Sequence, residues 1–229
     1  MAKKKKNANY VTEKTVAAKE KKQEEKLKAE KAKKIKIASI VSASVAAFVG
    51  LIMLILALSG AFDYHPKVTH HASVTLSDGT SFHIELYGDD AHESVESFVA
   101  LCNKGYFNGK SILSLTGSVL YMGDENADGG TNGIKGEFAG NGVENNIPMK
   151  KGTLIMARGE GNNSAYGQFG ILSKKLPALE GNYAAFGRLS DPSVLKDIIK
   201  SCTFDADGNV ITAPTIQSIS IHSDADHAH

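Results

Sequence analysis

The chain has 229 residues and a formal net charge of +1, from 26 Lys and Arg against 25 Asp and Glu. The charges are unevenly distributed: residues 1–36 hold 14 Lys and 5 Glu, residues 37–62 hold none, and the remaining residues hold 12 basic and 20 acidic side chains. That remainder is long enough for one domain with a core, but too short for two. With 22 Gly and only 5 Pro, the composition excludes a collagen-like chain.

Residues 37–62 form an uninterrupted apolar run without charge or proline. As a helix at ~1.5 Å per residue, a run of this length crosses a bilayer with some tilt. We therefore predict a single transmembrane helix. A buried core helix and a cleaved signal peptide are the alternatives, and Ser59, Gly60 and Ala61 have the small side chains of a cleavage site. The run is longer than the ~7–15 apolar residues of a signal peptide, which favours a retained anchor.

The Lys-rich segment 1–36 precedes this run, and basic flanks stay on the cytoplasmic side of a membrane. We expect a cytoplasmic N-terminal tail and an extracytoplasmic C-terminal domain at the cell membrane. Residues 12–34 are rich in helix formers and predict a solvated helix, with the pairs Glu24/Lys28 and Glu30/Lys34 at i,i+4. The lysines act either as a topology signal alone or also by attracting anionic lipid.

The first elements of the domain follow a short polar linker, which we place at residues 63–72. Two runs of alternating apolar and polar residues flank Ser77-Asp78-Gly79 and predict a β-hairpin. Residues 90–105 predict an amphipathic helix with an Asp90/Glu93 capping box and Gly105 as its stop. Its apolar face carries side chains at i, i+3, i+4 and i+7, namely Val95, Phe98, Val99 and Cys102.

The rest of the domain is predicted to be mostly strands. Short apolar runs separated by Gly- and Asn-rich turns favour a closed or nearly closed antiparallel β fold. A second helix is predicted to begin at Asp191-Pro192, where an N-cap residue precedes Pro at the first helical position. A polar tail over 222–229 ends the chain. The predicted strands are 118–122, 153–157, 169–172, 184–189 and 215–221.

Cysteines and acidic clusters give no sign of a metal site. We expect Cys102 and Cys202 to be free thiols, because two cysteines cannot build a disulfide framework and Cys102 falls on the apolar helix face. Asp-rich stretches beginning at Asp124 and Asp205 resemble calcium loops but lack the closing ligands, so they are predicted to be turns. The histidines and aspartates of 222–229 are predicted to be a disordered terminus. No metal and no cofactor is therefore expected.

Six segments of the domain carry a recognisable series of motifs: residues 84–109, 129–138, 141–146, 151–158, 163–171 and 179–189. In this order they resemble the cyclophilin-type peptidyl-prolyl cis-trans isomerase family. The resemblance extends over 73–221 and keeps the family's order of elements. It implies a mainly β fold, an eight-stranded antiparallel barrel with two capping helices, preceded in this chain by the predicted transmembrane helix.

The chemistry that this resemblance implies is non-covalent. An Xaa-Pro bond rotates over a barrier of ~18–20 kcal/mol, so it isomerises in ~10–100 s unaided. A site that binds the twisted amide better than either planar isomer speeds this exchange. In the family, an apolar pocket holds the proline ring and an arginine hydrogen-bonds near the prolyl amide.

The family roles carry over only in part. The arginine position is occupied by Ser114, the second aromatic ring of the pocket by Gly170, and a usually larger side chain by Ala178. The sequence holds two arginines, Arg158 and Arg188, and Arg158 is a possible substitute because it follows the pocket alanine. The substrate-binding positions that the resemblance supports are Met156, Ala157, Gln168, Phe169, Leu179 and Tyr183.

Three functions remain open from the sequence. The first is a membrane-anchored, extracytoplasmic isomerase of reduced activity that assists protein folding. The second is an inactive module that binds proline-containing or extended peptides as a chaperone or complex partner, and the third is a structural protein with a vestigial groove. Expected partners are proline-containing segments of exported proteins, and the membrane through 37–62. An acidic domain argues against nucleic acid, and a monomer is expected.

Overall fold

The computed structural model describes residues 2–58 and 64–223. The chain divides into two compact units, residues 1–62 and 63–229, which are described separately below. The last residues of the predicted membrane segment, the small residues 59–61 and most of the predicted polar tail lie outside the described residues.

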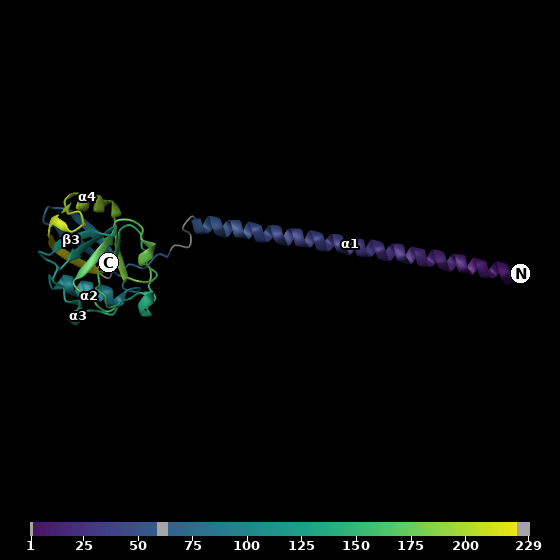
Figure 1. The fold of residues 1–229 in the computed structure, drawn as a ribbon, viewed down its shortest axis with the longest axis horizontal. Coiled ribbons are helices and arrows are strands. Elements are labelled where there is room, and N and C mark those ends of the chain that lie inside the picture. Colours follow the sequence, from purple (N-terminus) through teal and green to yellow (C-terminus); the bar gives the residue numbers. More distant parts are fainter. Residues whose placement is uncertain (1, 59–63, 224–229) are drawn as a thin grey trace, which may run out of the picture. The chain divides into compact units, whose positions relative to one another are not determined.

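The first unit is one continuous helix, α1 (Ala2–Leu58), which carries both the Lys-rich and the apolar segment (Figure 1). Two ion pairs confirm the predicted i,i+4 spacing: Lys28 Nζ lies 2.8 Å from Glu24 Oε1, and Lys34 Nζ lies 3.2 Å from Glu30 Oε1. Large apolar side chains remain uncovered, for example Ile40 at 68% and Phe48 at 63% exposure. Among the described residues, one helix is long and apolar enough to cross a membrane, and a signal sequence would have the same character.

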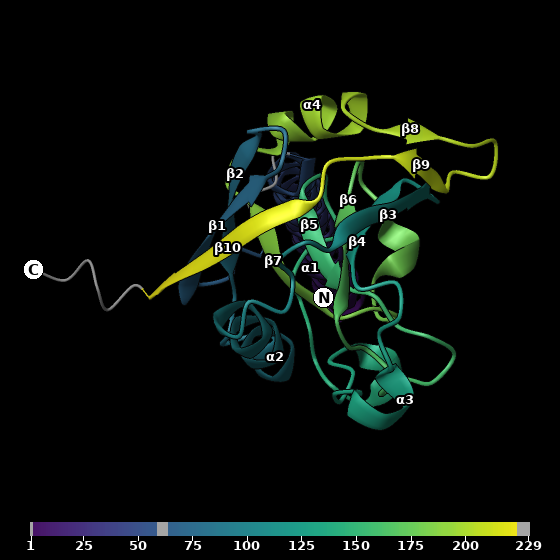
Figure 2. The same cartoon turned by 90° about the vertical axis from the view of Figure 1, so that its left-hand side faces the viewer.

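The second unit is built on an eight-stranded antiparallel sheet with the strand order β10-β1-β2-β7-β5-β6-β4-β3 (Figure 2). This confirms the eight-stranded antiparallel architecture. A separate hairpin is formed by β8 (Thr203–Phe204) and β9 (Val210–Thr212). The strands of the main sheet are β1 (His70–Leu76), β2 (Ser81–Leu86), β3 (Ser111–Thr116), β4 (Val119–Gly123), β5 (Thr153–Met156), β6 (Gln168–Leu172), β7 (Ala185–Leu189) and β10 (Ile216–Ser223).

The sheet curls so that its two edge strands meet. Ile216 N donates to Lys110 O and Gly109 N donates to Ile216 O, each at 2.7 Å. An antiparallel bridge between Ser111 and Thr215 lies next to these bonds. The curled sheet therefore approaches the closed barrel that the resemblance implied, and only a few hydrogen bonds join its two edge strands.

Most predicted strands are confirmed within one or two residues, and so is the hairpin at Ser77-Asp78-Gly79, where Gly79 has φ +89°. Among the strands, β3 and the β8–β9 hairpin were not predicted. Strand β3 mixes Ser and Thr with three apolar residues and lacks clear alternation, and β8 and β9 are very short. In addition, β1 begins at His70, so residues 70–72 of the predicted linker belong to a strand.

Helix α2 (His92–Asn103) packs Val95, Phe98 and Cys102 into the core and ends as predicted before Gly105, at φ +66°. The predicted Asp90/Glu93 capping box is wrong. Glu137, only 6% exposed, accepts hydrogen bonds from Glu93 N at 2.9 Å, Ser94 N at 2.9 Å and Ser94 Oγ at 2.7 Å. The helix is therefore capped by a carboxylate that lies far away in the sequence, at the end where a negative charge is most favourable.

The second predicted helix begins with a short 3₁₀ turn (Pro192–Val194) and continues as α4 (Leu195–Lys200). Asp191 caps the turn as predicted, because its Oδ1 accepts from Ser193 N at 2.8 Å. The remaining short helical segments are α3 (Gly129–Asn132) and two 3₁₀ turns, Ala139–Asn141 and Pro177–Leu179.

Four phenylalanines form the centre of the core. Phe98 lies 5.4 Å from Phe107, 5.3 Å from Phe169 and 5.4 Å from Phe186, measured between ring centroids. The T-shaped arrangement of Phe98 and Phe169 is one that aromatic pairs prefer. Both cysteines are free thiols, as predicted, and burial raises the pKa of the Cys102 thiol to about 12.

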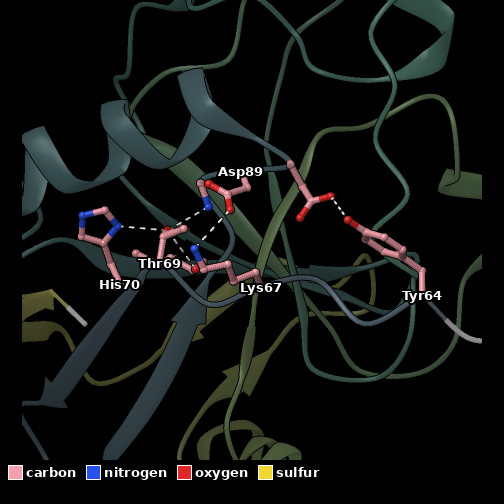
Figure 3. Close-up of polar contacts among 8 residues, drawn as sticks. Tyr64, Lys67, Thr69, His70 and Asp89 are labelled. Carbon is pink, nitrogen blue, oxygen red and sulfur yellow. Dashed lines mark hydrogen bonds and ion pairs between the residues drawn. The ribbon is translucent and has the colours of Figure 1, made fainter. Parts of the chain in front are cut away.

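The segment before β1 is fastened to the loop that precedes α2 (Figure 3). The Tyr64 hydroxyl donates to Asp90 Oδ1, and Lys67 Nζ lies 3.7 Å from Asp89 Oδ2. Thr69 Oγ1 accepts from Gly88 N at 2.9 Å and donates to Leu86 O at 3.2 Å. Residues 64–69 are thus bound to the domain ahead of its first strand.

Candidate active-site groove

A single row of residues crosses four strands on one face of the curled sheet, half-buried at its β3 and β4 end and buried at its β6 and β5 end. Ser114 of β3 pairs with Tyr121 of β4, Tyr121 pairs with Gly170 of β6, and Gly170 pairs with Ile155 of β5. Directly opposed residues on antiparallel strands share a face, so these four side-chain positions lie together. We call them the groove row.

The strand residues on either side of the groove row point inward. Leu120, Met122 and Phe169 are fully buried, whereas Ser114 and Tyr121 are only half-buried. A register shift between Ile112 and Ser114 places Ser114 opposite Tyr121. Ser114 Oγ accepts a hydrogen bond from Thr116 Oγ1 at 2.9 Å on the same strand. The position of the family arginine is therefore on the outer face, with a short hydroxyl in place of a guanidinium.

A cavity of about 310 Å³ lies at one end of this face, where β5 and β6 meet the loops around α3. It is lined by small residues and a few polar side chains. Among its lining residues are Ala157, Arg158, Gln168, Gly129, Ser164 and Tyr166. The structure thus brings three residues singled out in the sequence, Ala157, Arg158 and Gln168, to one hollow.

The side-chain amide of Gln168 is held in one orientation. Its Nε2 donates to the main-chain oxygen of Asp124 at 2.6 Å. Because a carbonyl can only accept, the nitrogen faces Asp124 and the amide oxygen of Gln168 is left as an acceptor. That orientation suits a backbone N–H of a bound peptide.

Asp124 is itself fixed by two neighbours. Lys110 Nζ lies 2.9 Å from its Oδ2, and the Tyr106 hydroxyl donates to the same oxygen at 2.8 Å. The hydrogen bond from Lys110, followed by that from Tyr106, lowers the pKa of the Asp124 carboxyl below its usual range. Asp124, which begins an Asp-rich turn, thus positions Gln168 through its main-chain oxygen.

Arg158 is held between two aromatic rings. Its guanidinium carbon lies 4.9 Å from the ring centre of Tyr183 and 5.2 Å from that of Phe138. Nε and Nη2 donate to Asn182 O at 3.2 Å, and Nη1 donates to Gly159 O at 3.1 Å and to Glu160 O at 3.4 Å. Four of its five N–H groups are therefore occupied by main-chain oxygens.

The structure separates the other predicted substrate-binding residues. Met156 and Phe169 oppose each other across β5 and β6 and are 3% and 0% exposed, so they lie in the interior. Leu179 ends a 3₁₀ turn, and Tyr183, whose N–H donates to Leu179 O at 3.2 Å, follows it half-buried. Sequence reasoning missed Tyr121, whose position beside Ser114 and Gly170 arises only from strand pairing.

The site contains an oriented acceptor, a hollow with small walls and aromatic side chains, but no arrangement of nucleophile and base. Within residues 2–58 and 64–223, no group of three or more His, Cys, Asp or Glu side chains could hold a metal ion. Such a surface is suited to holding an extended peptide by its backbone and an apolar side chain.

Comparisons with known proteins agree with this. The model of the cyclophilin-type peptidyl-prolyl cis-trans isomerase family matches residues 71–221. Peptidyl-prolyl cis-trans isomerase 10 of Caenorhabditis elegans is 30% identical over 159 residues, which cover 66% of this chain and 96% of the relative. A Helicobacter pylori peptidyl-prolyl cis-trans isomerase is 24% identical and covers 65% of this chain and 90% of its own.

Solved structures show the same fold. A Cryptosporidium parvum cyclophilin-type isomerase superposes with a TM-score of 0.57 at 24% identity, covering 68% of this chain and 99% of the other. The same protein in the presence of the dipeptide Ala-Pro superposes with a TM-score of 0.56. On the match over residues 71–221 and these relatives, the chain belongs to the cyclophilin-type peptidyl-prolyl cis-trans isomerase family, and its homologues support isomerase activity by family.

Proposed function

We propose that this protein is a membrane-anchored, extracytoplasmic prolyl isomerase of reduced activity that acts on proline-containing segments of exported proteins. The observation that carries the proposal is the state of the groove. Gln168 is oriented with a free amide oxygen beside Ala157 and the cavity, whereas the arginine position holds Ser114. Peptide-binding elements are retained while the strongest polar element is missing.

Reduced activity follows from the chemistry of the missing group. A guanidinium supplies a rigid fork of charged donors that a serine hydroxyl cannot reproduce. A charge-assisted hydrogen bond made mainly in the transition state is worth on the order of 2–4 kcal/mol, or ~30- to 1,000-fold in rate. The remaining groove still favours the twisted amide through its shape and its backbone acceptor.

Arg158 is a weak candidate for a substitute. With four N–H groups held by main-chain oxygens, one remains for a substrate. We expect Arg158→Ala to disturb the packing between Phe138 and Tyr183 and to lower peptide affinity, with little separate effect on the catalytic step. An isomerisation rate that falls at saturating peptide, with affinity retained, would instead show that Arg158 compensates for the lost arginine.

The alternative function is a module that binds peptides without turnover. It is favoured by two observations, the serine at position 114 and the engagement of Arg158 by the protein's own carbonyls. The two functions differ in one measurable quantity, the rate of prolyl isomerisation at a peptide concentration where the site is occupied.

The test uses residues 63–229, which contain the whole sheet and its core. The alignment covers 96% of the Caenorhabditis elegans relative, so this domain by itself makes up nearly an entire protein there. Isomerisation and binding of one Ala-Pro peptide are measured on the same preparation. Peptide binding together with an isomerisation rate above the uncatalysed rate supports the isomerase. Peptide binding with only the uncatalysed rate supports the binding module. If the domain neither binds nor isomerises the peptide, both functions are wrong.

Two glutamines provide a matched pair for this test. Gln168→Ala should weaken peptide binding about tenfold, as expected for losing an oriented hydrogen bond and its positioning. Gln217→Ala is the control, because Gln217 is exposed on β10. Equal binding by both variants would mean that the peptide does not use the groove.

Restoring the arginine gives a direct prediction. We expect Ser114→Arg to raise the isomerisation rate at least tenfold, because it returns a charged donor to the outer face. Ser220→Arg, on an exposed position of β10, controls for the added charge. An unchanged rate in Ser114→Arg would show that the rest of the groove has also lost its fit to the twisted amide.

The membrane part of the proposal is supported by the uncovered apolar surface of α1 and by the lysines before it. The full chain should resist extraction from membranes by alkaline carbonate, and its C-terminal domain should be digested by protease added outside the cell. A shorter, soluble product lacking the first ~60 residues would identify a cleaved signal sequence instead.

A further inference from the structure

One aromatic residue lies between the two positions at which the groove departs from its family. Tyr121 of β4 is opposite Ser114 on one side and opposite Gly170 on the other. It therefore adjoins both the place of the missing arginine and the place of the missing ring. No motif of the sequence assigns a role to it.

Packing around Gly170 shows what fills the space of the missing ring. A Cβ atom on Gly170 would stand 3.3 Å from Tyr121 Cδ1, 2.5 Å from Val119 Cγ1 and 3.3 Å from Ile155 Cγ1. Any side chain at this position would thus press against its neighbours. The glycine lets the Tyr121 ring approach the β6 backbone, so aromatic surface reaches this place from the adjacent strand.

The hydroxyl of Tyr121 is available to a ligand. Tyr121 is half-buried, and among the described residues its hydroxyl has no hydrogen-bond partner. Burial, with a smaller contribution from the neighbouring Tyr183, raises the pKa of the Tyr121 phenol. The group therefore stays protonated at neutral pH and can donate a hydrogen bond.

We propose that Tyr121 is the residue of the groove that contacts the substrate proline: its ring supports the proline ring, and its hydroxyl donates to the prolyl amide. The inference deepens the proposed function and rests on it. The tyrosine phenol supplies one neutral donor where a guanidinium would supply several charged ones. Hydrogen bonds between neutral groups are about half as strong as charge-assisted ones. The chain would thus keep part of the transition-state stabilisation without an arginine on this face.

The two parts of the side chain predict two different kinetic effects. Tyr121→Phe removes only the oxygen, so the isomerisation rate at saturating Ala-Pro peptide should fall about three- to tenfold while Kd changes less than twofold. Tyr121→Leu removes the aromatic face but keeps an apolar side chain, so Kd should rise at least fivefold. Tyr64→Phe, which changes a tyrosine hydroxyl bonded to Asp90 outside the groove, is the matched control and should leave both values unchanged.

The measurements use residues 63–229, with thermal unfolding of each variant to confirm that it is folded at the assay temperature. If Tyr121→Phe is as fast as the wild type, the donor role is wrong, and if Tyr121→Leu binds as tightly as the wild type, the contact with proline is wrong. Both results leave the proposed function intact, provided the wild type itself isomerises the peptide. A wild type that neither binds nor isomerises the peptide overturns the proposed function and this inference together.

Discussion

The inner and outer faces of the same strands differ in the kinds of residue that they carry. Inward positions of β4 and β6, such as Leu120, Met122 and Phe169, are apolar, large and fully buried. Outward positions of the same strands hold Tyr121 and Gly170, and Ser114 lies beside them. Since side chains alternate along a strand, one face can keep the fold while the other changes its chemistry.

The largest effect should come from the inner face. Phe169→Ala removes a fully buried ring in contact with Phe98 and Phe107, and we expect a loss of about 3–5 kcal/mol in the free energy of unfolding. Urea denaturation of the variant and the wild type measures this loss in the free energy of unfolding. Tyr121→Ala on the neighbouring outward position should cost less than half as much. Similar losses for both would break the distinction between the faces.

A second effect concerns the helix that closes the core. Glu137→Ala removes three hydrogen bonds to the first turn of α2 and should destabilise the domain by about 2–3 kcal/mol. Glu144→Ala is the matched control, because Glu144 is exposed and bonds only to Asn146 nearby. Native-state hydrogen exchange should show the loss first in the amides of α2. Uniform loss over the whole sheet would mean that Glu137 supports more than this helix.

Substitutions on the outer face should change the free energy of unfolding less than substitutions in the core. Gly170→Ala places a methyl group 2.5 Å from Val119 Cγ1, and the resulting shift should cost about 1–2 kcal/mol. Gly159→Ala, where the nearest atom would be Ser164 Oγ at 3.5 Å, should be nearly neutral. Thermal unfolding compares the two variants. If Gly170→Ala is also neutral, the space next to Tyr121 is larger than its neighbours indicate.

The smallest effect is the pH dependence that Asp124 contributes. Its pKa is lowered in the folded state by Lys110 and Tyr106, so its contribution is complete above pH ~4 and is lost as pH falls through the folded-state pKa. Because the ion pair is partly exposed, we expect less than ~1 kcal/mol. Asp124→Asn should remove this share of the stability difference between pH 7 and pH 3. A larger change would indicate stronger coupling to Gln168.

Patterns within a few residues of one another were predicted well. The turn at Asp78-Gly79, the apolar stripe of α2 and the Asp191 cap are all encoded locally, and each is confirmed. The α2 cap was predicted wrongly because Glu137 reaches it from another part of the chain. Strand β3 was missed because its pattern of Ser, Ile and Leu is weak without its partner β4.

The groove was harder to predict than the fold. Motif matching placed Gln168 and Phe169 together, but adjacent strand residues point to opposite faces, so Phe169 lies in the core. Tyr121 owes its place between Ser114 and Gly170 to pairing across three strands. Neither fact follows from the spacing of residues along one segment, since both require the register of the sheet.

The pairing of β1 with β10 also sets the order in which the domain can be completed. β1 is the first strand of the domain and β10 the last, and they run side by side from His70 opposite Ser223 to Leu76 opposite Ile216. A chain delivered from its N-terminus must therefore leave one edge of β1 without its final neighbour until the last strand has been released. The latest moment of the domain's folding is therefore fixed by its eight-residue strand β10.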